Sequence, residues 1–146
     1  MAIQQAVANS FKKEILEGIH DLETGGDTFK LALYEDTANL SAATTAYPGD
    51  STGGQVGDTG QYVQGGGVLT GQATSLDTGV AIVDFGDLSF TGVTLTARGA
   101  LIYNTSESNK AVAVLDFGGN KTATAGTFTI QFPDFNSTSA ILRISG

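Results

Sequence analysis

The sequence predicts a mainly β protein: an antiparallel β-sandwich or jelly-roll-like domain with one N-terminal α-helix. Short apolar runs fill the last third of the chain, from Thr94 to Ile144, and turn residues separate them at intervals of about eight to twelve residues. The 20 glycines and the low share of charged residues, 15%, fit a protein with many tight turns. A helical spacing of apolar residues is convincing only near the N-terminus.

Residues 1–24 have the pattern of an amphipathic helix. Apolar side chains recur every three or four residues and form one stripe along it. Thr24, Gly25 and Gly26 follow, and a glycine there can adopt the left-handed conformation that ends many helices. We therefore expect one helix over residues 1–24. Its apolar stripe consists of Ile3, Val7, Phe11, Ile15, Ile19 and Leu22.

Residues 27–146 are expected to form the β-sandwich, within a single domain that spans residues 1–146. Thr28–Tyr34 is the clearest strand, because apolar and polar residues alternate along it. Further strands are expected at 61–63, 68–74, 80–85, 88–90, 93–97, 100–103, 111–117, 127–132 and 140–144. The predicted core comprises Phe29, Leu31, Leu33, Ile82, Phe90, Leu101, Val112, Val114, Phe128, Ile130, Phe132, Leu142 and Ile144.

Residues 36–67 form a long segment rich in glycine and small polar residues. So long a stretch without regular structure is unusual within a compact domain, so we expect a functional loop or an arm that becomes ordered against a partner. Its composition predicts that it fills no core, is mobile in the isolated protein and is at least partly ordered in an assembly. Tyr47, Pro48 and Tyr62 are its candidate contact residues.

Composition argues against several partners. The net charge is −8 and the seven basic residues are scattered, whereas nucleic-acid binding needs clustered Lys and Arg, so we expect no nucleic-acid partner. Charged residues throughout the first 22 positions argue against a membrane helix, and we expect no membrane partner. The absence of Cys excludes disulfides and thiolate metal sites.

No chemistry-bearing motif stands out, so we expect no catalytic residue, no cofactor and no metal. His20 is the only histidine, and its place near the end of the predicted helix indicates a solvated or capping role. The tripeptide Asp-Phe-Gly at 84–86 and 116–118 is interpreted as a strand followed by a turn. The acidic pairs at 35–36 and at 84 and 87 lack the ligand pattern of a calcium loop.

Six segments carry a resemblance to a known family: Phe11–His20, Thr28–Tyr34, Thr96–Asn104, Lys110–Gly119, Gly126–Pro133 and Ala140–Ile144. Together they cover nearly the whole chain except residues 36–60, and they resemble small virion structural proteins of tailed bacteriophages. The resemblance implies a capsid decoration, or cement, protein that binds the major capsid protein on the outside of an icosahedral shell and forms homo-oligomers. A negative net charge favours the outer face over a DNA-lined lumen.

Three alternatives to decoration remain open: a tail or neck subunit, a module that binds a host receptor or glycan, and an enzyme. The helix stripe is expected either to pack on the protein's own sandwich or to cover a neighbouring subunit or the capsid. The candidate interface residues are Ile3, Val7, Phe11, Ile15, Tyr47, Pro48 and Tyr62.

Overall fold

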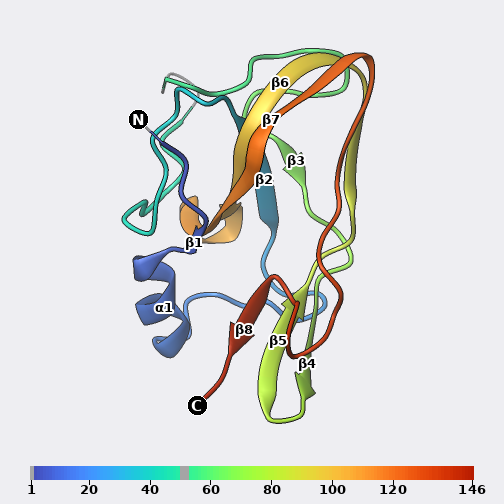
Figure 1. Ribbon diagram of the computed structural model, residues 1–146. Coiled ribbons are helices and arrows are strands. Elements are labelled where there is room, and N and C mark those ends of the chain that lie inside the picture. Colours follow the sequence, from blue (N-terminus) through green and yellow to red (C-terminus); the bar gives the residue numbers. More distant parts are fainter. Residues whose placement is uncertain (1, 50–52) are drawn as a thin grey trace.

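The computed structural model describes residues 2–49 and 53–146 (Figure 1). Two antiparallel sheets and one N-terminal helix confirm the predicted mainly β fold and are consistent with a β-sandwich. In the described parts of the chain, no helix is both long and apolar enough to span a membrane. The elements are β1 (Ala6–Val7), α1 (Asn9–Leu16), β2 (Phe29–Tyr34), β3 (Gly67–Val68), β4 (Ala73–Asp77), β5 (Val80–Asp84), β6 (Leu88–Asn104), η1 (Thr105–Glu107), β7 (Lys110–Ile130) and β8 (Leu142–Ile144).

A long hairpin of β6 and β7 organises the larger sheet. The two strands have 17 and 21 residues and pair from Leu88 opposite Ile130 to Asn104 opposite Lys110. Figure 1 shows that this hairpin bends over at the top of the molecule. The half next to η1 pairs with β2 on one side and β1 on the other, which gives the strand order β1-β7-β6-β2-β3.

The bend arises from extra residues in β7. Between the pairs Gly99–Asp116 and Ala97–Lys121, β7 contains more residues than β6, and such a bulge turns the strand. Asp-Phe-Gly at 116–118 therefore lies inside a strand, and the expectation that it ends one is wrong here. The Asp116 carboxylate accepts from Arg98 Nε and from the Gly118 backbone N–H, each at 2.9 Å. These bonds, chiefly that from Arg98, hold the pKa of Asp116 below its ordinary value.

The smaller sheet has the strand order β4-β5-β8. β4 and β5 are joined by a two-residue turn in which Thr78 and Gly79 both have positive φ, 49° and 84°, as a type I′ hairpin turn requires. The predicted strand at 68–74 is wrong, because β3 and β4 are separate strands. Gly71 lies between them with φ of 66°, a conformation that strands do not adopt.

The predicted helix is wrong in its extent. Residues 6–7 pair with β7, and Ile3 forms a bridge with Leu40, so residues 2–8 are not helical. α1 ends at Leu16, and Gly18, with φ of 73°, follows it. The helical spacing arises because Ile3, Phe11 and Leu22 reach the same core from different segments. Backbone pairing with β7 therefore outweighs the local helical pattern.

The predicted core is confirmed with two exceptions. Phe132 is only half-buried, although its ring packs 5.7 Å from that of Phe85. Ile144 is 59% exposed, because β8 runs past the core to the rim of the molecule. The expectation that residues 36–67 fill no core is also wrong, and positions 50–52 of that segment lie outside the described residues. Its buried side chains include Ala38, Leu40, Val56 and Tyr62.

Gly99 tests the close packing at the bend. An added Cβ there would lie 2.3 Å from the Leu115 carbonyl oxygen and 2.8 Å from Ile3 Cγ2. We expect Gly99→Ala to lower the free energy of unfolding by about 1–3 kcal/mol in urea titrations. Gly119→Ala is the matched control, since an added Cβ there meets nothing within 4 Å. Equal stability of the two variants would contradict this description of the bend.

Candidate functional site: an apolar groove beside helix α1

A groove of about 630 Å³ lies between α1 and the β4-β5-β8 sheet. In Figure 1, α1 lies to one side of β8, with β5 and β4 beyond it. Several lining residues are buried, among them Phe11 on α1 and Leu142 on β8. At the rim, Leu16 on α1 is 88% exposed and Ile144 on β8 is 59% exposed. The groove therefore has a packed apolar base and an exposed apolar rim.

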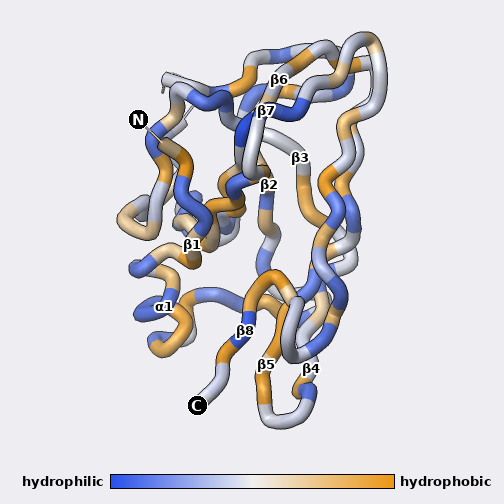
Figure 2. Tube along the Cα trace, viewed as in Figure 1, coloured by the Kyte–Doolittle hydropathy of each residue, from blue (hydrophilic) through white to orange (hydrophobic). Residues whose placement is uncertain are grey.

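Strand register extends this apolar surface across the smaller sheet. Leu76 pairs with Ala81, and Ala81 pairs with Ile144, so the three residues form one row on the same face of β4, β5 and β8. All three are exposed, Leu76 by 73%. Figure 2 shows apolar stretches on α1, β5 and β8 around the groove. Contiguous exposed apolar surfaces are typical of interaction sites.

The charges at the groove have the opposite sign to the protein as a whole. Lys12 and Arg143 line it, and none of its lining residues is Asp or Glu, although the chain has 15 acidic and seven basic residues. Lys12 Nζ donates to Asn9 Oδ1 at 3.2 Å, and Arg143 donates to the Thr138 carbonyl at 2.6 Å. Within residues 2–49 and 53–146 neither cation forms an ion pair.

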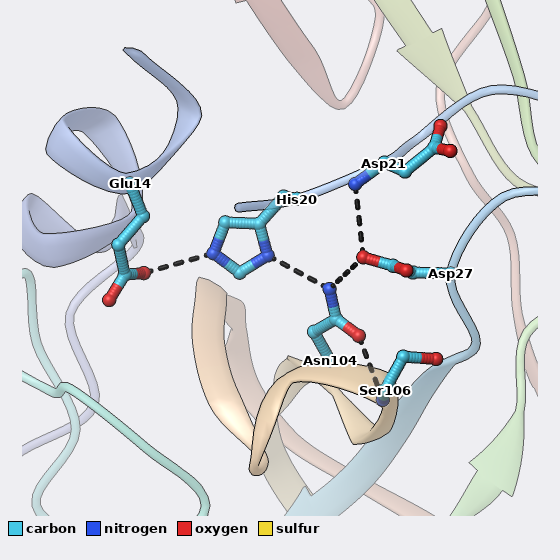
Figure 3. A network of polar contacts seen from close by, with 6 residues as sticks. All are labelled: Glu14, His20, Asp21, Asp27, Asn104 and Ser106. Carbon is cyan, nitrogen blue, oxygen red and sulfur yellow. Dashed lines mark hydrogen bonds and ion pairs between the residues drawn. The ribbon is translucent and has the colours of Figure 1, made fainter. Parts of the chain in front are cut away.

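A buried polar network fixes the residues that follow α1 (Figure 3). The side chain of His20 is fully buried and lines the groove. Its Nε2 lies 2.9 Å from Glu14 Oε1 on α1, and its Nδ1 lies 3.0 Å from Asn104 Nδ2 at the end of β6. Asn104 Nδ2 also donates to Asp27 Oδ2 at 2.8 Å. The network thus ties α1 and the segment that follows it to the central hairpin.

The network also fixes the proton on His20. Asn104 Oδ1 accepts from the Ser106 backbone N–H at 3.0 Å, which directs the Asn104 NH₂ group toward His20 and Asp27. His20 Nδ1 is therefore an acceptor, and Nε2 carries the proton and donates to Glu14. Both ring nitrogens are used within the protein, so neither is available to a substrate or a metal ion.

The expected solvated or capping role of His20 is therefore wrong. The helix ends before His20, and the ring packs 4.7 Å from that of Phe11. Its partner Asn104 lies 84 positions away in the sequence, so no local pattern could have indicated this contact.

The structure brings together part of the predicted interface. Val7, Phe11 and Ile15 line the groove. Ile3 and Tyr62 do not belong to a surface, because they are 6% and 1% exposed in the protein's own core. Tyr62 contributes there through its hydroxyl oxygen, which accepts from the Leu33 backbone N–H at 2.8 Å.

Tyr47 and Pro48 lie away from the groove. The half-buried Tyr47 ring stacks on Tyr103 at 4.5 Å, and Pro48 borders a second hollow of about 480 Å³. Sequence reasoning missed Leu16, Lys12 and Arg143 as groove residues. Leu16 lies next to Ile15 but outside the apolar stripe, and its position beside β8 depends on the tertiary fold.

The acidic pairs show no metal-binding arrangement. In the described residues, no three His, Cys, Asp or Glu side chains gather where they could hold a metal ion. Asp36 accepts from Asn120 at 3.2 Å, and Asp87 accepts from the Phe132 backbone N–H at 2.9 Å. These carboxylates therefore have structural roles in loops and strand ends.

No protein-family model, curated protein or solved structure matches this chain. The resemblance to phage virion proteins stays a prediction from the segments quoted above.

The network generates a stability prediction. Asn104→Asp replaces the donating NH₂ with an oxygen that faces Asp27 Oδ2 and the acceptor Nδ1 of His20. We expect a loss of about 1–3 kcal/mol from the free energy of unfolding at neutral pH. Asn120→Asp is the control, because its amide also donates to a carboxylate but is exposed. Similar urea midpoints for the two variants would show that the network does not stabilise the fold.

Substitutions on α1 show which groove residues belong to the protein's own core. The Phe11 side chain is 4% exposed and belongs to the core, so Phe11→Ala should cost about 3–5 kcal/mol of stability in the isolated protein. Leu16→Ala, at an 88% exposed position five residues later on the same helix, should change stability by less than about 0.5 kcal/mol. A stable Phe11→Ala protein would mean that α1 does not pack on its own core.

Proposed function

We propose that this chain is a non-enzymatic structural protein of a phage virion, a decoration protein that docks on the outer surface of the capsid through the groove beside α1. The observation that supports docking is the exposed apolar rim of a groove with a packed base. Leu16 and Ile144 cost free energy when they face water, and covering them against a neighbouring protein recovers it.

The groove is also held in shape before a partner arrives. Phe11 anchors α1 in the core, and the network through His20 and Asn104 ties the segment after α1 to the hairpin. On the other side, β8 is paired with β5. A preorganised surface loses little conformational entropy on binding, which suits a protein that has to adhere to a completed shell.

The composition of the groove favours a protein partner over the alternatives. A glycan site is expected to present exposed aromatic side chains. In the described residues, Phe135 is the only aromatic among the large exposed hydrophobic side chains, and it does not line the groove. An enzyme needs an accessible acid, base or nucleophile, and both ring nitrogens of His20 are already bonded.

The virion setting comes from the resemblance to phage structural proteins, and the major capsid protein is the proposed partner. The net charge of −8 supports an outer position, because a DNA-lined lumen would repel an acidic protein. A tail or neck position is the second candidate, and the same groove would serve there on a different neighbour.

Placing negative charges on the apolar rim tests this function. Leu16→Asp combined with Ile144→Asp should leave the isolated protein folded, since both side chains are exposed, but should reduce co-sedimentation with capsids that lack the protein at least tenfold. Val63→Asp is the control, because Val63 is 61% exposed and does not line the groove. Wild-type binding by the double variant would contradict the proposal, and binding of the wild type only to tails or necks would favour the second candidate.

A further inference from the structure

We infer that the groove takes an extended segment of the partner that carries carboxylates and adds as a fourth strand to the free edge of β8. This inference rests on the proposed function, because it names the chemistry of the partner at the same site.

One backbone edge of β8 is not paired with another strand of the described chain. Within residues 2–49 and 53–146, β8 pairs with β5 alone and is the edge strand on the side toward α1 (Figure 1). Apart from this pairing, residues 142–146 form no backbone hydrogen bond with the rest of the described chain. Alternate N–H and C=O groups of an antiparallel strand point to each side, so the outer edge presents unpaired groups along the groove.

An extended segment suits the free edge of β8 better than a helix does. A helix uses its own backbone groups internally, so a helix laid in the groove would cover the outer edge of β8 without pairing it. Each backbone group that is buried without a partner then opposes binding, because it loses its hydrogen bonds to water. An extended segment pairs with these groups instead. On such a strand every second side chain would face the side of the sheet that carries Ala81 and Ile144, and Ile15 and Leu16 on α1 form the opposite wall of the groove.

The two cations at the groove indicate that the partner segment is acidic. A partner that covers the groove removes Lys12 and Arg143 from water, and a buried cation is tolerated only when it is paired. The groove lining supplies no carboxylate, so the partner has to supply it. Elsewhere the protein is net acidic and repels such a segment, which directs an acidic strand to this site.

Charge reversal within one helix tests this assignment. Lys12→Glu should weaken binding to capsids that lack the protein at least tenfold. Lys13→Glu should leave it nearly unchanged, because Lys13 does not line the groove and pairs with Glu17 on the solvent side. Hydrogen exchange on bound wild-type protein should show new protection of amides in 142–145.

A probe that does not depend on capsids completes the experiment. An extended heptapeptide of alternating valine and threonine with glutamate at both ends should bind the isolated protein and protect the same amides. The peptide with lysine in place of glutamate should bind at least tenfold more weakly. Equal binding of the two peptides, no binding of either, or binding without protection of 142–145 would overturn the inference.

The outcomes separate the two proposals. Capsid binding that depends on Leu16 and Ile144, without protection of β8 and without an effect of Lys12→Glu, keeps the docking function and refutes the strand. If the protein binds the acidic peptide at β8 but does not bind capsids, the inferred strand addition is supported and the capsid function is refuted. If the protein instead self-associates through the groove, and the double Asp variant does not, the inference that an acidic segment of a partner occupies the groove is refuted.

Discussion

The bent pairing of β6 with β7 is the constraint on which the other elements depend. In the half of the hairpin near η1, β6 pairs with β2 and β7 pairs with β1. The hairpin therefore forms the centre of the larger sheet. The bulge in β7 and the close approach of Gly99 to Leu115 turn the hairpin. After the far half of β7, residues 131–141 connect the hairpin to β8. β8 is an edge strand of the smaller sheet.

The groove lies where two separately anchored parts meet. α1 belongs to the first sheet, through the N-terminal pairing with β7 and through Phe11 and the His20–Asn104 contact. β8 belongs to the second sheet through β5. Because neither part fully covers the other, Leu16 and Ile144 stay exposed on opposite walls. The geometry that leaves this surface open is therefore a consequence of the topology.

Local patterns predicted the fold where the structure depends on local alternation. The β2 residues Phe29, Leu31 and Leu33 alternate in sequence and are all buried, as expected. The N-terminal stripe failed because backbone pairing of Val7 with Ala113, more than a hundred positions away, outweighs a helical period. Helix propensity and apolar spacing give no account of such a distant partner.

The candidate site was predictable only in part, for the same reason. Val7, Phe11 and Ile15 were identified because they are apolar and regularly spaced. Lys12 and Leu16 gain their role from β8, which follows them by more than a hundred residues and carries Arg143. Tyr62 looked like a contact residue in a polar loop, yet its hydroxyl accepts a backbone N–H in the core. Loop composition alone does not separate a surface tyrosine from one that closes a core.

Electron cryomicroscopy of intact virions, at a resolution that traces the chain, tests the central claim that the groove beside α1 is the docking surface. We expect α1 and β8 to face the shell, with an extended segment of the capsid protein paired along β8 and a carboxylate near Lys12 or Arg143. A decorated capsid in which this groove faces solvent, while another face of the protein contacts the shell, would contradict the account.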